Sequence, residues 1–152
     1  MSTPAAVVPR PAATVILARD TSAGIEVFMM KRTEDVVFAK GMHVFPGGAI
    51  DKTDRAADIA ARCVDLDDRQ ASEHLGVAEG GLAYWIAAIR ECFEEAGLLL
   101  GYRDMRELVR LEGDEAERLA QLRLDLAADR LKFIDILERE GLRAATDRIA
   151  YY

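Results

Sequence analysis

Apolar residues recur at helical spacing through the middle of the chain, in residues 82–96. The steps of four, three and four residues place these side chains on one face of a helix. Gly97 follows, and glycine is the residue that most often stands just past a helix end. The pattern therefore predicts an amphipathic helix over residues 82–96. Its apolar positions are Leu82, Ile86, Ile89 and Phe93.

Short apolar runs near the beginning of the chain predict strands. Residues 12–18 are rich in β-branched side chains, residues 20–24 have turn composition, and residues 25–32 form a second apolar run. The two runs are expected to pair as a hairpin. Residues 43–48 predict a third, brief strand that ends in glycines. Residues 1–11 contain several prolines and predict a flexible arm.

In the rest of the chain, apolar residues mostly recur at helical intervals, with a break at residues 76–81. A return to strand is predicted at Ile149. Further helices are predicted over residues 54–63, 69–75, 105–112, 114–128 and 131–140.

Composition narrows the class of protein. The chain has 152 residues, which suits one domain, and 51% of them are hydrophobic, which is enough for a core. The net charge is −7. This charge argues against nucleic acid or an anionic membrane as a partner, because both require an excess of Lys and Arg. A nucleotide-sized substrate remains compatible with it if a metal supplies positive charge.

Targeting and redox features are also informative. The opening residues lack a charged region followed by a long apolar run, so no signal peptide is expected. No stretch approaches the roughly 18 apolar residues of a membrane span. Cys63 and Cys92 lie far apart without a C-x-x-C pattern, and both are predicted to be buried apolar residues. A soluble, cytoplasmic protein is expected.

Three carboxylates gather on one side of the central helix. Glu91, Glu94 and Glu95 are three and four residues apart, which places them on one face. Like charges at this spacing repel by a few tenths of a kcal/mol per pair. An arginine or a bound cation can offset that repulsion. A solvated helix face is the alternative explanation.

The segment RECFEEAGL, residues 90–98, resembles the second half of the signature of the Nudix hydrolase family. That signature is G-x5-E-x7-R-E-U-x-E-E-x-G-U, where U is a bulky apolar residue. The upstream sequence FPGG, residues 45–48, also resembles the family's lead-in to the signature. The resemblance extends over about residues 12–100. Its matched positions are Arg90, Glu91, Glu94, Glu95, Gly97 and Leu98.

The first half of the signature differs from the family pattern. Five residues separate Gly48 from Asp54, which stands where the signature has glutamate. Asp54 and Arg90 are separated by 35 residues, whereas the signature has seven. We interpret residues 55–81 as an insertion within the signature. Asp54 then either replaces the glutamate or caps the helix predicted at this point. The alternative is a degenerate signature that starts at Gly76 and has an apolar residue in place of the glutamate.

An insertion at this place resembles the coenzyme A diphosphatase-like branch of the family. The motif of that branch is R-[SA]-x3-R-x3-G-x3-FPGG. Arg32, Gly41 and residues 45–48 match it by spacing, and Thr33 is a near match. Val37 replaces the second arginine.

The resemblance implies a single Nudix domain over residues 1–152. The expected fold is an α/β/α sandwich around a mixed sheet, with extra helices from the insertion and from the C-terminal part. Members of this branch usually continue past the length of this chain. The chain is therefore either complete or C-terminally truncated. A truncated domain is expected either to be inactive or to complete itself as a homodimer, by dimerisation or strand exchange.

The resemblance also implies a catalytic helix that holds Mg²⁺ or Mn²⁺. Hard cations prefer oxygen ligands, and they neutralise a diphosphate and lower the pKa of bound water. Arg90 is expected to orient a glutamate, and Glu94 is the candidate base, although the family varies on the base. The expected catalytic set is Glu94, Arg90 and Glu91. The expected metal ligands are Glu91, Glu94, Glu95 and the backbone of Gly47. The expected substrate-binding residues are Arg32, Lys40 and Gly48.

The implied activity is Mg²⁺-dependent hydrolysis of a diphosphate bond in a small-molecule nucleotide derivative. Coenzyme A or an acyl-coenzyme A is the first candidate substrate. ADP-ribose, NADH or another nucleotide diphosphate is the alternative. A Nudix-like module that binds a nucleotide or a protein without hydrolysis is a second alternative, which the intact glutamates disfavour.

Overall fold

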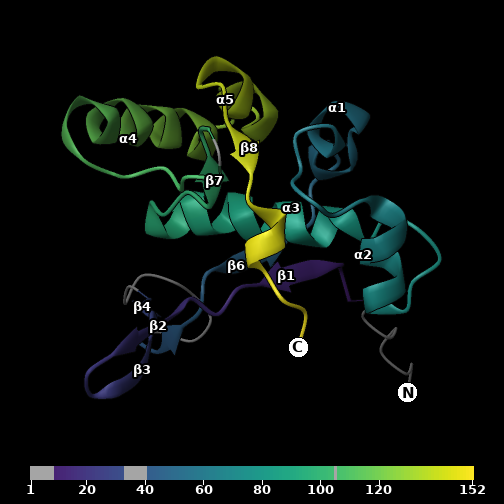
Figure 1. Ribbon diagram of the computed structural model, residues 1–152, viewed down its shortest axis with the longest axis horizontal. Helices are drawn as coiled ribbons and strands as arrows, with labels where there is room; N and C mark the ends of the chain where they lie inside the picture. The colour runs from purple at the N-terminus through teal and green to yellow at the C-terminus, as the bar shows by residue number, and fades with distance from the viewer. Residues whose placement is uncertain (1–8, 33–40, 105) are drawn as a thin grey trace, which may run out of the picture.

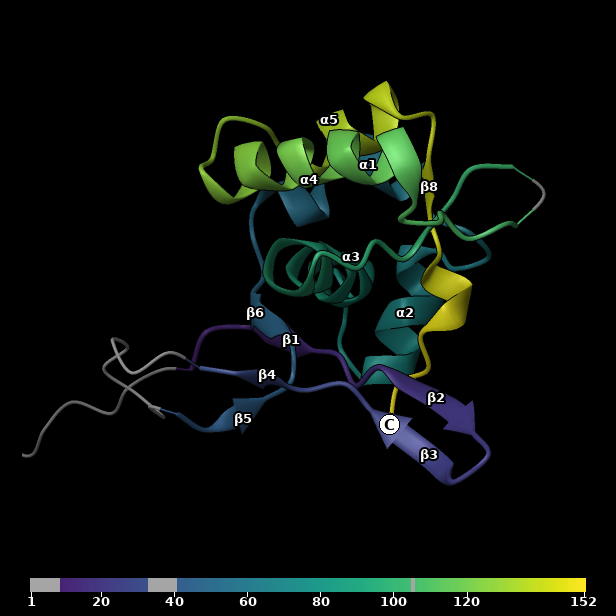
Figure 2. The same cartoon turned by 90° about the vertical axis from the view of Figure 1, so that its left-hand side faces the viewer.

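One central helix lies between a pair of strands and a group of helices. The computed structural model describes residues 9–32, 41–104 and 106–152. Helix α3 (Leu82–Glu91) runs through the middle, with β1 (Ala12–Thr14) and β6 (Gly47–Ala49) on one side. Helices α1 (Ala57–Ala60), α4 (Gly113–Ala127) and α5 (Phe133–Arg139) lie on the other side in both views (Figures 1 and 2).

The remaining elements are short. The other strands are β2 (Ala18–Thr21), β3 (Gly24–Val27), β4 (Met30–Lys31), β5 (His43–Val44), β7 (Gly101–Tyr102) and β8 (Arg143–Ala144). The other helical segments are η1 (Thr53–Arg55), α2 (Asp68–Leu75), the turn η2 (Cys92–Ala96) and η3 (Thr146–Arg148).

Helix α3 is buried on two sides, because layers pack against it from both directions. The predicted apolar stripe is confirmed: its four residues face the main core, together with leucines of α4 and α5. On the strand side, Ala88 and Cys92 pack against Val15 in a second cluster. A helix that is apolar on most of its surface has to be enclosed in this way. The three carboxylates lie off these two apolar faces, and Glu95 is the exposed one.

The predicted hairpin is confirmed, but its first strand is divided. Strands β2 and β3 pair antiparallel, with Thr21 opposite Gly24. Residues 12–18 change partner along their length, since β1 pairs with β6 and the Val15 N–H donates to the Pro46 carbonyl at 2.9 Å. The chain then continues into β2 and the hairpin.

The mixed α/β class is confirmed, whereas the sheet is less continuous than expected. The strands form four antiparallel pairs, β1–β6, β2–β3, β4–β5 and β7–β8. In the described part of the chain, parallel pairing is limited to one bridge, between Cys63 and Ala144. The helices therefore provide most of the core.

Three local predictions are wrong. The helix predicted over residues 54–63 divides into η1 and α1, because Ala56 between them is extended. Among the described residues of 105–112 no helix forms, since the Val109 N–H donates to the Gly101 carbonyl and the segment returns alongside β7. The C-terminal strand is β8, which precedes Ile149. Tertiary pairing outweighs helical spacing in these segments.

Residues 55–81 pack against the start of α3. Helix α2 begins with a capping box of Asp67 and Gln70 and ends at Gly76, which has a left-handed conformation. The Asp68 carboxylate accepts the backbone N–H groups of Gly80 and Leu82 at 2.9 and 3.0 Å. The N-terminus of α3 is thus capped by α2 and not by a side chain of its own.

The two cysteines are buried thiols, as predicted. Burial raises the pKa of Cys63 and of Cys92 to about 11. Both thiols are therefore protonated at neutral pH and act as small apolar groups. No helix in the described ranges has the length and apolar character needed to cross a membrane.

Candidate metal and diphosphate site

The acidic residues lie where α3 changes into a wider turn. Residues 92–96 form a π-helical turn, η2, which ends at Gly97 in the left-handed conformation. Turns of this kind inside helices are frequent at functional sites. The side chains of Glu91 and Glu94 are 14% and 23% exposed, and Glu95 is exposed. The acidic turn is therefore accessible at one edge and sheltered at the other.

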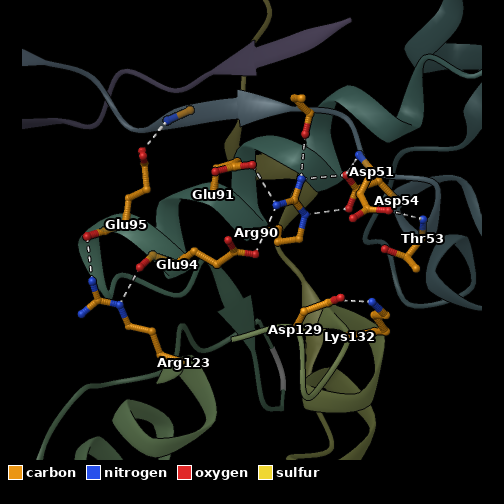
Figure 3. A network of polar contacts seen from close by, with 12 residues as sticks. Asp51, Thr53, Asp54, Arg90, Glu91, Glu94, Glu95, Arg123, Asp129 and Lys132 are labelled. Atoms are coloured by element: carbon orange, nitrogen blue, oxygen red, sulfur yellow. Dashed lines mark hydrogen bonds and ion pairs between the residues drawn. The ribbon is translucent and has the colours of Figure 1, made fainter. Parts of the chain in front are cut away.

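Arg90 connects the acidic turn to Asp54 (Figure 3). Its Nε and Nη2 donate to the two oxygens of Asp54, each at 3.0 Å. Its Nη2 also donates to the Ala49 carbonyl at 2.9 Å. Its Nη1 donates to Glu91 at 2.8 Å and to Glu94 at 3.2 Å. One guanidinium thus satisfies three carboxylates and a carbonyl, in the bidentate geometry that arginine favours.

Asp54 lies at the far end of this network and is almost fully buried, with 2% exposure. Its carboxylate also accepts the Asp51 N–H at 2.8 Å. Burial opposes the charge on Arg90, but the contacts with Asp54 and Glu91 outweigh burial and raise the pKa of Arg90 above its ordinary value. Asp54 lies within η1 and does not cap a helix. The helix-cap interpretation of Asp54 is therefore wrong, and Asp54 is instead the buried partner of Arg90.

The two glycines of FPGG contact the acidic turn closely. The Gly47 N–H donates to the Glu95 carboxylate at 2.9 Å. A Cβ atom at Gly48 would lie 2.3 Å from an oxygen of Glu91. Only glycine leaves room for the Glu91 carboxylate at this position. The FPGG strand and the acidic helix, which are far apart in sequence, thus form one site.

The charge of Glu91 is disfavoured by its surroundings. Burial raises the pKa of the Glu91 carboxyl, Arg90 opposes this shift, and the charges of Glu94 and Glu95 add to it. A carboxylate that is partly buried among other carboxylates gains from a nearby cation. A cation bound beside Glu91 would therefore offset the cost of its charge.

The raised pKa of Glu91 predicts the pH dependence of stability in the metal-free chain. The folded state binds the Glu91 proton more tightly than the unfolded state, whose carboxyl has the ordinary pKa of 4.5. The free energy of unfolding therefore decreases as the pH rises from 4.5 through the raised pKa. We expect wild type to lose stability relative to Glu91→Gln over this range. Urea unfolding of both proteins in EDTA, from acidic to neutral pH, measures the difference. A constant difference would contradict the assignment.

The carboxylate oxygens of this site are suitable ligands for a hard divalent cation, although they form hydrogen bonds within the chain. In the described ranges, no three His, Cys, Asp or Glu side chains converge closely enough to hold a metal ion. Glu94 is paired with Arg90, and Glu95 accepts the Gly47 N–H. All the side-chain donors are carboxylate oxygens, which Mg²⁺ and Mn²⁺ accept. Each of these two contacts uses one oxygen of the carboxylate.

The structure does not bring Arg32, a predicted substrate-binding residue, into this arrangement. Lys40 lies outside the described residues. Arg32 is exposed, and its backbone N–H donates to the Met42 carbonyl at 3.0 Å. Within the described ranges, no hydrogen bond or ion pair joins the Arg32 side chain to the acidic turn. The residues that the structure brings together are Gly47, Gly48, Arg90, Glu91, Glu94 and Glu95.

Sequence reasoning missed Arg123 of α4. Its Nε and Nη2 donate to the carbonyls of Glu94 and Glu95, both at 2.7 Å. The spacing of Leu119, Leu122 and Leu126 on α4 is the one feature of the sequence that could have indicated Arg123. Residue 123 is four positions after Leu119, where an apolar residue is expected on the buried stripe.

A groove of about 690 Å³ lies on another part of the molecule. It runs between residues 12–18 and the C-terminal residues 148–152, with Tyr84 and Trp85 in its wall. None of the predicted site residues lines this groove. The groove is therefore separate from the acidic turn.

Known proteins resemble this chain in sequence and fold. It is 27% identical over 144 residues to acyl-coenzyme A diphosphatase NUDT19 of Xenopus laevis, covering 78% of this chain and 38% of that protein. It is 30% identical over 101 residues to the Homo sapiens protein of the same name, covering 51% and 27%. The chain thus spans less than half the length of these relatives. No protein-family model matches the sequence.

The fold has a counterpart among solved structures. A Nudix hydrolase from Alicyclobacillus acidocaldarius superposes with a TM-score of 0.57 and 27% sequence identity, over 90% of this chain and 57% of that one. In sequence and in fold the chain is thus similar to Nudix hydrolases. These likenesses support the resemblance to the coenzyme A diphosphatase-like branch that the sequence indicates.

Proposed function

We propose that this chain is a diphosphatase that uses Mg²⁺ or Mn²⁺ to cleave a diphosphate bond in a nucleotide derivative. The observation that carries the proposal is the meeting of three helix carboxylates with the Gly47–Gly48 turn around one buried arginine. The relatives' names, Nudix hydrolase and acyl-coenzyme A diphosphatase, support the same class of reaction.

Glu91, Glu94 and Glu95 are the proposed ligands of the metal. A bound divalent cation neutralises the charge of a diphosphate and makes a nearby water more acidic. Glu94 is the proposed general base, because its side chain is partly exposed beside the other two carboxylates. Arg90 orients Glu91 and Glu94 from the buried side, in the manner of residues that support metal ligands.

Coenzyme A or an acyl-coenzyme A is the proposed substrate. Water adds to one phosphorus, the bridging P–O bond breaks, and the other phosphate leaves with the bridging oxygen. The products from coenzyme A are phosphopantetheine and adenosine 3′,5′-bisphosphate. Arg32 and Lys40 are the proposed contacts of the substrate phosphates, and Gly48 allows close approach of its backbone.

The purified chain tests the proposal when it is incubated with Mg²⁺ or Mn²⁺ and four substrates side by side. These are coenzyme A, ADP-ribose, NADH and a diadenosine polyphosphate, with products identified by mass. We expect cleavage of coenzyme A, and loss of most of that activity in Glu94→Gln. Arg19→Gln is the matched control, because Arg19 forms an exposed pair with Glu26 on the β2–β3 hairpin. A folded, metal-loaded wild type that cleaves none of the four substrates would refute the proposal.

The engaged carboxylates favour a second candidate, a Nudix-like module that binds a nucleotide without cleaving it. Glu94 and Glu95 already have partners in the chain, Arg90 and Gly47. Nucleotide binding that is unchanged in Glu94→Gln and Glu95→Gln, with no turnover in wild type, would favour this candidate over the enzyme.

A further inference from the structure

The guanidinium of Arg123 holds two consecutive carbonyls of the acidic turn. These carbonyls belong to Glu94 and Glu95, two of the proposed metal ligands, and both hydrogen bonds are 2.7 Å long. Arg123 reaches the turn from α4 (Figure 3), whereas the N–H that binds the Glu95 carboxylate belongs to Gly47 of β6. The backbone and the side chain of Glu95 are thus fixed by different parts of the chain.

These carbonyls are the ones that a helix end leaves without partners. The last carbonyls of a helix have no intrahelical donors, and the end of a helix carries partial negative charge. The Gly97 N–H binds the Phe93 carbonyl at 3.0 Å and closes the turn. The carbonyls of Glu94 and Glu95 follow that closure, and Arg123 supplies both donors and a positive charge. A cation at this end also reduces the repulsion among the carboxylates.

Arg123 reaches the turn from a firmly packed helix. Leu119, Leu122 and Leu126 of α4 are all buried in the main core. Arg123 extends from the same face of α4 and is itself partly buried. A Cβ atom at Gly97 would lie 3.2 Å from its Nη1, so the guanidinium rests directly on that glycine. The position of the acidic turn therefore depends on the position of α4.

We propose that Arg123 is a positioning residue that sets the backbone of the π-helical turn so that Glu94 and Glu95 can bind a divalent metal together. This inference rests on the proposed function, because it concerns the same carboxylates. It assigns a role in the site to the helical region after residue 104, which the family signature does not cover. Arg123 acts through the backbone and touches neither metal nor substrate.

Three variants of the full chain test the inference, with Mn²⁺ alone as the probe. Arg123→Gln removes the charge and most of the donors, and Arg123→Lys keeps the charge but loses the paired geometry. Arg130→Gln is the matched control, since Arg130 pairs with Asp125 at the end of the same helix and is 60% exposed. Mn²⁺ affinity is measured by electron paramagnetic resonance. Exchange of the amide protons of residues 92–98 and urea unfolding are measured on the same samples.

We expect Arg123→Gln to weaken Mn²⁺ binding by about 10–100-fold, the usual effect of losing a residue that supports metal ligands. Arg123→Lys is expected to fall between that variant and wild type, and Arg130→Gln to match wild type. Amide exchange in residues 92–98 is expected to accelerate in Arg123→Gln. If Arg123→Gln does not fold, the affinity of Arg123→Lys decides the question.

The outcomes separate this inference from the proposed function. Variants of Arg123 that unfold more easily but bind Mn²⁺ as wild type does would show a purely structural role and overturn the inference. In that case the proposed function stands if wild type binds Mn²⁺ and cleaves a diphosphate. A wild type that neither binds Mn²⁺ nor cleaves any of the four substrates would overturn both.

Discussion

Replacing Arg90 with methionine is expected to lower the free energy of unfolding by about 3–5 kcal/mol, the usual cost of breaking a buried ion pair. The side chains of Arg90 and Asp54 are only 9% and 1% exposed. Methionine fills similar space but leaves the Asp54 carboxylate buried without its charged partner. It also removes the cation between Glu91 and Glu94. Because a small domain has a total stability of about 5–15 kcal/mol, this is the largest effect that we expect from one substitution.

Urea unfolding at pH 7, followed by circular dichroism, measures this loss. Arg19→Met is the control, since its pair with Glu26 is exposed at 78% and 52% and is worth about 0–1 kcal/mol. The double variant Arg90→Met, Asp54→Leu is expected to be more stable than Arg90→Met alone, because it leaves no unpaired buried charge at Asp54. An Arg90→Met protein as stable as Arg19→Met would contradict the structural role of the pair.

The elements that sequence predicts well here are those whose own side chains determine their burial. Helices α3 and α4 have long apolar stripes, and the hairpin has a turn between two apolar runs. Residues 105–112 have a similar spacing, yet the described part of this segment pairs with β7 instead. Such pairing depends on contacts that are distant in sequence, which a local pattern does not contain.

The site shows the same division. The motif relates Arg90 to the glutamates, because these residues are adjacent on one helix. The motif leaves two alternatives for Asp54, which either replaces the glutamate or caps a helix. The choice between them depends on its buried pair with Arg90, which is 36 positions away in sequence. Arg123 lies outside the motif altogether, and only an arginine at an apolar position of α4 indicated it. The parts of a site that the signature does not contain are here supplied by neighbouring helices.

The substitutions Gly47→Ala and Gly48→Ala are expected to affect different properties, although the two residues are adjacent. The first is expected to lower stability, and the second to lower Mn²⁺ affinity. A Cβ at Gly47 would lie 2.4 Å from the Ala13 carbonyl and 2.7 Å from the Thr14 Cα, which belong to the backbone of β1. Backbone cannot move away without separating β1 from β6. We therefore expect Gly47→Ala to cost about 1–3 kcal/mol of unfolding free energy, as other overpacked sites do.

At Gly48, the three heavy atoms nearest to the same added atom all belong to the carboxylate of Glu91, the closest at 2.3 Å. A carboxylate at the end of a side chain can rotate away, so Gly48→Ala is expected to remain nearly as stable as wild type. The rotation takes Glu91 from its position beside Arg90, and Mn²⁺ binding is expected to weaken by about 10–100-fold. Urea unfolding and Mn²⁺ titration of both variants measure the two effects. If Gly48→Ala binds Mn²⁺ as tightly as wild type, displacing the Glu91 carboxylate does not affect the metal. Glu91 would then be removed from the proposed ligand set.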